Sequence, residues 1–329
     1  MKMKRVLQIG TVLLAGLVAA APALAVNFPE VEPNDAKATA TPANCLNPGD
    51  TVSGTSTAST GAGIDTFLLT TCGQPLGIYR HEMTITSSIV GHTGTIRGLT
   101  QSAGGVINAG TNTAVQTSSS TTTPPRFNAW YGFGKSEQLY YQVTGAAATT
   151  APYTSTLTST PVSATYLGIF QPGNITIQTL GQTTTDTDFW VYDSNLNAIP
   201  GYGNDDESIA GGGGGTTLQG LLTRSYSNGS LYYLALTNFN LANNLASPPD
   251  EDFQLGSVLD FPNAVANSST TTGLNLNFRV TDSAGSTNFV STKTAPFQIQ
   301  WFAFSVPEPS TIALLGLGLL ATLKRRRSA

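Results

Sequence analysis

The sequence predicts an all-β protein: two tandem antiparallel β-sandwich domains of the jelly-roll kind, flanked by an N-terminal signal peptide and a C-terminal short transmembrane helix. After Val26, apolar and polar residues alternate in short segments bounded by Gly, Pro, Asn and Asp, as in half-buried strands. No long segment there repeats apolar residues at helical spacing. The 34 glycines and 18 prolines indicate many turns. Many short strands without helices favour antiparallel sandwiches.

The first 25 residues have the three parts of a secretory signal peptide. These parts are a basic start, an apolar stretch and a small-residue cleavage site, namely Lys2, Lys4 and Arg5, then Val6–Ala21, then Ala23-Leu24-Ala25. Cleavage at that site makes Val26 the first mature residue. An uncleaved N-terminal anchor is the alternative.

Residues 26–160 are expected to form the first sandwich. Its clearest strand patterns are Asp65–Thr70, Tyr79–Thr86, Thr95–Leu99, Phe127–Phe133 and Gln138–Thr144. Ala103–Pro125 is low in apolar residues and rich in Ser, Thr and Gly. We therefore expect a long loop there.

Residues 161–305 are expected to form the second sandwich. Its strand patterns are Asn174–Thr179, Asp188–Tyr192, Leu231–Leu236, Leu274–Val280 and Phe297–Trp301. The glycine run Gly211–Gly215 predicts a flexible surface loop. Asp250-Glu251-Asp252, which follows two prolines, predicts a solvated loop.

The part of the chain between the two targeting segments is acidic. The whole chain has 15 Lys and Arg against 19 Asp and Glu, and the targeting segments hold seven of the basic residues and one acid. Residues 26–305 therefore carry 8 bases and 18 acids, a net charge of −10. Because an acidic surface repels phosphate backbones, we expect no nucleic-acid partner.

The chain has two cysteines, Cys45 and Cys72. In an exported protein, two cysteines of one domain are expected to pair. The alternative is a pair of buried free thiols.

Residues 306–329 combine three features in a fixed order. They are a stiff polar breaker, an apolar run and a basic cluster, namely Pro307-Glu308-Pro309, Ile312–Leu323, and Lys324 with Arg325, Arg326 and Arg327. The apolar run is shorter than the ~20 residues of a spanning helix, which favours a weak or transient anchor with its basic end in the cytoplasm. This tail resembles the PEP-CTERM sorting signal of Gram-negative bacteria. The resemblance implies that exosortase, a membrane protease, recognises and cuts it.

A second resemblance concerns the mature chain. The blocks Glu30–Asp35, Ala38–Ala40, Gly49–Gly54 and Asp65–Phe67 are similar to the opening of bacterial pre-peptidase C-terminal domains, which are small β-sandwiches. Ser163–Asn240 resembles the later part of such a domain through Phe189–Asp193, Gly203–Asp206 and Gly229–Tyr233. No part of the chain resembles the protease that such domains accompany. In some relatives the acidic opening binds calcium.

The residue types of this opening suit calcium on their own terms, because calcium prefers several hard oxygen ligands. The candidate ligands are Glu30, Glu32, Asn34, Asp35 and Asp65. The alternative is a solvated acidic segment without an ion. A fainter candidate group comprises Asp186, Asp188, Asp193, Asn204, Asp205, Asp206 and Glu207, of which Asn204-Asp205-Asp206 is more simply a turn.

The residues do not predict an enzyme. His81-Glu82-Met83-Thr84-Ile85 begins like the zinc-protease motif, but Ile85 replaces the second histidine and the segment has strand periodicity. A packed, hydrogen-bonded His81 is favoured over a catalytic one. No Gly-x-Ser-x-Gly elbow is present. Aromatic strand residues such as Trp130, Trp190 and Trp301 are expected in the core rather than on a sugar-stacking face.

We therefore expect an exported, non-enzymatic cell-surface or extracellular-matrix protein that is sorted through its tail. The tail resemblance implies exosortase as one partner, extracellular polysaccharide or biofilm matrix as another, and at least transient contact with the membrane. Two alternatives stay open: a calcium-dependent carbohydrate- or protein-binding adhesion module, and a secreted carboxylate-based hydrolase.

Overall fold

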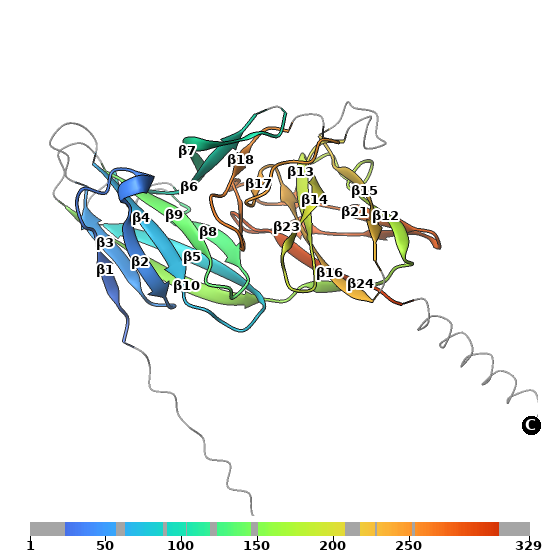
Figure 1. Ribbon diagram of the computed structural model, residues 1–329, viewed down its shortest axis with the longest axis horizontal. Helices are drawn as coiled ribbons and strands as arrows, with labels where there is room; N and C mark the ends of the chain where they lie inside the picture. The colour runs from blue at the N-terminus through green and yellow to red at the C-terminus, as the bar shows by residue number, and fades with distance from the viewer. Residues whose placement is uncertain are drawn as a thin grey trace, which may run out of the picture.

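The computed structural model describes residues 24–56, 63–87, 91–102, 104–118, 124–145, 151–207, 218–227, 229–251 and 254–308. These residues form β-strands in several sheets, with one short 3-10 turn, η1 (Lys37–Thr39) (Figure 1). The all-β class expected from the alternating pattern is therefore confirmed.

Two large sheets, to which the first half of the chain contributes most of the strands, pack around a shared core. One has the order β1 (Asn27–Pro29), β3 (Thr51–Thr55), β10 (Pro152–Val162), β5 (Ile78–Ser87), β8 (Phe127–Gly132), β19 (Ala264–Asn267), β17 (Leu241–Ala242). The other has the order β18 (Ser257–Val258), β6 (Thr93–Gln101), β9 (Gln138–Thr144), β4 (Ile64–Thr71), β2 (Thr41–Leu46), with β7 (Ile107–Thr117) also paired to β6. Met83 and Trp130 of the first sheet share the core with Phe67 and Tyr141 of the second.

The remaining strands build a second layered unit. Its five-stranded sheet has the order β11 (Thr165–Ile169), β24 (Gln300–Val306), β16 (Ser230–Asn238), β13 (Thr187–Tyr192), β14 (Ala198–Asn204). Its four-stranded sheet has the order β15 (Leu221–Tyr226), β12 (Gly173–Gln178), β21 (Phe278–Asp282), β22 (Gly285–Phe289), and β20 (Leu274–Asn275) pairs with β23 (Thr292–Lys293). Phe189 and Leu234 pack with Ile177 and Phe278 in its core.

Residues 241–267, called the bridging segment below, connect the two units. The segment follows β16 in sequence, yet its strand β18 pairs with β6 and its strand β19 pairs with β8 (Figure 1). The division into domains 26–160 and 161–305 stays a prediction. The pairing shows that the bridging segment shares sheets with strands of the first half of the chain.

An aromatic cluster also joins the two units. Phe133, which follows β8, lies 5.7 Å from Trp301 and 5.3 Å from Tyr192 between ring centroids. Tyr131 accepts a 3.1 Å hydrogen bond from the amide of Ile299. These side chains are buried, so the contact is part of the protein interior.

The prediction of a long loop over residues 103–125 is wrong, because Ile107–Thr117 forms strand β7, which pairs with β6. Most of β7 has no buried face, so its composition of Thr, Asn and Gly gives no apolar alternation. It is held by backbone pairing and by Gln116, whose Nε2 donates to the carbonyls of Ala129 and Asn267 at 2.8 and 2.7 Å.

The disulfide between Cys45 and Cys72 is formed. Cys45 lies in β2 and Cys72 follows β4, so the bond fastens edge strand β2 to its parallel neighbour.

The targeting segments lie largely outside the described residues. The predicted signal peptide has only Leu24 and Ala25 among them, and the predicted tail has only Val306, Pro307 and Glu308. Pro309, Arg325, Arg326 and Arg327 are thus outside the described part, as is the glycine run Gly211–Gly215. Among the described residues, none belongs to a helix with the length and apolar character needed to span a bilayer.

Candidate metal site

The acidic segment Glu30–Asp35, called the acidic opening here, crosses the first unit directly after strand β1. The backbone amide of Glu30 still donates to Ser53 of β3 at 2.8 Å. The next amide, of Val31, donates to the hydroxyl of Thr41 at 3.0 Å. These two bonds carry the segment from β3 towards β2, which is the neighbour of β4 and of Asp65.

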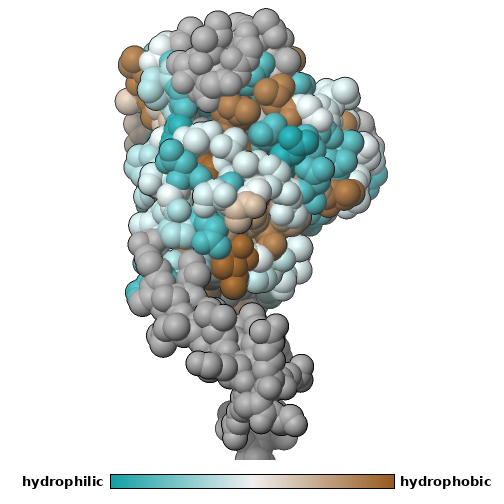
Figure 2. Space-filling model, turned by 90° about the vertical axis from the view of Figure 1, so that its right-hand side faces the viewer, coloured by the Kyte–Doolittle hydropathy of each residue, from teal (hydrophilic) through white to brown (hydrophobic). Residues whose placement is uncertain are grey.

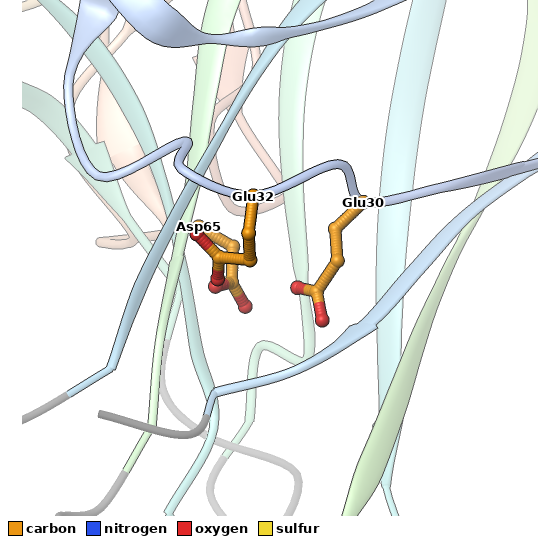
Figure 3. Close-up of side chains that lie close together, drawn as sticks. All are labelled: Glu30, Glu32 and Asp65. Atoms are coloured by element: carbon orange, nitrogen blue, oxygen red, sulfur yellow. The ribbon is translucent and has the colours of Figure 1, made fainter. Parts of the chain in front are cut away.

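Three of the predicted ligands meet at this point. Glu30, Glu32 and Asp65 each offer a carboxylate oxygen, and these oxygens lie within 4.8 Å of one another. Figure 3 shows the three carboxyl groups directed into the same space, with Glu30 and Glu32 on one segment. Glu32 is exposed, Glu30 is half-buried, and Asp65 is only 1% exposed. The exposure of the three carboxylates thus decreases from Glu32 through Glu30 to the buried Asp65.

Neutral donors hold one oxygen of each carboxylate. The Oε1 of Glu30 accepts from the amide of Thr55 at 2.8 Å, and the Oδ2 of Asp65 accepts from the hydroxyl of Ser56 at 3.1 Å. The Oε2 of Glu32 accepts from the amide of Asn34 at 3.1 Å. Among the described residues, no Lys or Arg forms an ion pair with any of the three acids.

Two buried oxygens have no hydrogen-bond partner among the described residues: Oε2 of Glu30, within this group, and Oδ1 of Asn34, whose backbone amide donates to Glu32. Asn34 is fully buried, and its Nδ2 donates to the Thr41 hydroxyl at 3.4 Å. An unpaired buried acceptor is costly, so these oxygens mark places where a cation is favourable. Asp35, in contrast, is exposed and does not belong to the group.

Burial shapes the electrostatics of the site. Burial, together with the nearby charge of Glu30, raises the pKa of Asp65 to about 7, although the hydroxyls of Tyr153 and Ser56 act in the opposite direction. Burial and the charge of Asp65 also raise the pKa of Tyr153. The site therefore holds a proton on Asp65 near neutral pH when no cation replaces it.

Gly54 is a site residue whose role the sequence reasoning missed. A Cβ atom on this residue of β3 would overlap the carboxylate of Glu30 and would come within 2.7 Å of the Tyr153 hydroxyl. The glycine therefore leaves the space that the carboxylate occupies. The only sequence signal was its place in the block Gly49–Gly54 of the family resemblance.

His81 is a structural residue. It is 1% exposed, stacks on Trp130 with ring centroids 5.2 Å apart, and bonds the Ser159 hydroxyl through Nδ1 at 2.6 Å. Burial lowers the pKa of His81 to about 4, so the ring is neutral at physiological pH. The packed, hydrogen-bonded histidine predicted for this strand is confirmed.

We predict a pH effect that depends on Asp65. Its pKa of about 7 in the folded protein exceeds the ~4 of an unfolded aspartate, so ionised Asp65 opposes folding when no cation is bound. This opposition is complete above the folded pKa and fades as the pH falls towards the unfolded pKa. In chelator, the wild type should therefore gain stability relative to Asp65→Asn between about pH 8 and about pH 5.

Melting temperatures of both proteins across that range measure the effect, and Asp35→Asn serves as a matched control at an exposed acid. The difference between wild type and Asp65→Asn should shrink on acidification, because the amide does not titrate. Parallel pH profiles of the two would contradict the raised pKa.

Comparison with known proteins identifies the tail. Residues 305–328 match the family model of the PEP-CTERM protein-sorting motif. No curated protein matches the chain. The matched motif indicates export and sorting through exosortase. The chain therefore carries a PEP-CTERM sorting motif over its last residues.

Proposed function

We propose that residues 26–305 form an exported, non-enzymatic cell-surface or extracellular-matrix protein, delivered by the signal peptide and the PEP-CTERM tail. The matched motif over residues 305–328 carries the export half of this proposal. The net charge of −10 and the low charged content of the chain suit a soluble extracellular protein. The surface in Figure 2 supports this, since hydrophobic residues lie scattered among hydrophilic and weakly polar ones.

The delivered part is proposed to consist of two tandem β-sandwiches that resemble pre-peptidase C-terminal domains. The two separate buried clusters, each filled from two sheets, support this organisation. The matched family model covers only residues 305–328, so this assignment rests on the quoted sequence blocks and on the layered architecture.

The acidic opening is proposed to bind one calcium ion. Three carboxylates converge, and Glu30 and the adjoining Asn34 each have a buried oxygen without a hydrogen-bond partner among the described residues. A set made only of oxygen donors suits calcium rather than zinc or copper. The bound ion supplies positive charge at this point, and Glu30, Glu32 and Asp65, with Asn34, would hold it. The ion would displace the proton that Asp65 otherwise retains.

We propose binding rather than hydrolysis at this site. A carboxylate hydrolase needs two acids that both reach the scissile bond. Asp65 is 1% exposed, so a bound sugar could contact Glu32 but not Asp65.

We propose that the protein binds the extracellular matrix through surface residues other than tryptophans. Trp130, Trp190 and Trp301 are all buried, which leaves no tryptophan face for stacking on sugars. A calcium-dependent adhesion module remains the second candidate, because the candidate ion site lies partly exposed through Glu32.

We predict that calcium stabilises the exported protein through this site. At a calcium concentration about 100 times the dissociation constant, binding contributes about 2.7 kcal/mol, which raises Tm by roughly 5–10 °C in a protein of this size. Differential scanning calorimetry in calcium and in chelator measures the shift. Asp65→Asn should lose a large part of it, and the exposed control Asp35→Asn should retain it. An undiminished shift in Asp65→Asn would argue against this site.

We predict that the tail controls retention at the surface. Deleting residues 306–329 removes the whole matched motif except Ser305, so the protein should pass from the cell-envelope fraction to the medium. Immunoblots of fractionated cells measure the distribution. A truncation that stops at Lys324, and so removes only the arginines and the last two residues, tests the basic cluster separately. Unchanged fractionation of the full deletion would contradict sorting through the tail.

A further inference from the structure

A second group of acids lies in the other unit, around the start of β13 and the end of β14. Asp186, Asp205 and Asp206 each offer a carboxylate oxygen, and these oxygens lie within 4.8 Å of one another. The same three residues line a cavity of about 170 Å³, together with Leu218, Phe239 and Leu255. The group therefore has both convergent donors and space beside them.

Asp205 supplies a second, independent indication of a binding site. Its side chain is 8% exposed, and its Oδ1 is buried without a hydrogen-bond partner among the described residues. The Oδ1 of Asp186 is in the same condition. Because a buried carboxylate oxygen without a donor is strongly unfavourable, an ion that contacts both oxygens would remove a large cost.

Two further acids, Asp188 and Glu251, lie close enough to interact electrostatically with the group. Asp188 and Glu251 are 6% and 7% exposed. The Oδ2 of Asp188 accepts from the amide of Leu241 at 2.5 Å, and the Oε1 of Glu251 accepts from the amide of Asp205 at 2.9 Å. No described Lys or Arg forms an ion pair with Asp186, Asp188, Asp205 or Glu251. Positive charge is thus lacking at a place where four acids are drawn together.

The sequence expectation for Glu251 was wrong. The Asp250-Glu251-Asp252 stretch reads as a solvated loop, but Glu251 is buried because its segment returns to the end of β14. Burial, together with the charges of neighbouring carboxylates, raises the pKa of Glu251 to about 7 and raises the pKa values of Asp188 and Asp205 well above their usual range.

We propose that Asp186, Asp205 and Asp206 form a second divalent-cation site, with calcium as its ligand, and that its occupancy fixes the bridging segment to the second unit. The donors are carboxylate oxygens alone, which is the chemistry that calcium prefers. The site is distinct from the acidic opening, because it is built on β13 and β14 of the other unit.

The link to the bridging segment follows from its hydrogen bonds. On one side, Glu251 and Leu241 of this segment hold Asp205 and Asp188. On the other side, Gln101 of β6 donates to the Ser247 hydroxyl at 2.6 Å and to the Leu255 carbonyl at 2.9 Å. The segment thus spans from the acids of one unit to a strand of the other. An ion that neutralises the acids strengthens the first of these two attachments.

The test counts calcium ions by isothermal titration of the chelator-treated exported protein, with magnesium titrated separately. We expect two calcium ions in the wild type. Asp205→Asn should retain one, Asp65→Asn should retain the other, and the double variant should bind none. Asp193→Asn, at a half-buried turn acid outside the group, is the matched control and should bind two.

The outcomes separate this inference from the proposed function. One ion that Asp65→Asn abolishes would overturn the second site and leave the acidic opening intact. One ion that Asp205→Asn abolishes would do the reverse. Two ions in Asp205→Asn would also overturn the second site. Since removal of a buried negative charge relieves repulsion, Asp205→Asn should fold in chelator, and its Tm there should equal or exceed that of the wild type.

Hydrogen exchange tests the structural consequence. With calcium at about ten times the dissociation constant, amides of residues 241–251 should exchange about tenfold more slowly than in chelator. Asp65→Asn should keep this protection, and Asp205→Asn should lose it. Equal exchange with and without calcium in the wild type would overturn the link to the bridging segment.

Discussion

The burial of carboxylates without basic partners is the constraint on which the rest of this structure depends. Asp65, Asp188, Asp205 and Glu251 are all nearly inaccessible to solvent, and among the described residues none forms an ion pair. A buried negative charge must be protonated, hydrogen-bonded or neutralised by a cation. Outside the cell, calcium meets this need for oxygen-only sites, including weak ones. We therefore expect the stability of this acidic protein to depend on the cations around it.

Two basic residues that are half-buried or fully buried, Lys37 and Lys293, make other contacts. Lys37 pairs with Asp260 of the bridging segment at 2.8 Å, which adds an attachment of that segment to the first unit. Lys293 is fully buried, and its Nζ donates to Asn238, Asn267 and the Ser269 carbonyl at 2.7–2.8 Å. Burial lowers the pKa of Lys293 to about 7, since no acid compensates its charge. Charges of both signs thus converge on the connection between the units.

Local patterns predicted the class of fold and the buried His81 and tryptophans, which depend on alternation within one strand. Asp65 was a candidate partner of Glu30 and Glu32, but its meeting with them depends on the packing of segments that are distant in sequence. The rest depends on pairing between distant segments. Strand β7 has no apolar alternation because most of its side chains are not buried, and Glu251 is buried because its segment returns to the end of β14. Asp35 was proposed as a ligand because it is close in sequence to Glu32 and Asn34. It is exposed, however, and lies outside the group of converging carboxylates.

The central claim, a calcium-organised protein of the extracellular matrix, is tested most directly by co-sedimentation of the exported protein with the matrix of its own host, in calcium and in chelator. The account predicts saturable binding that chelator weakens and that Asp65→Asn reduces. Absence of binding under both conditions would contradict matrix association. Equal binding in calcium and chelator would retain the matrix partner and contradict the role of calcium.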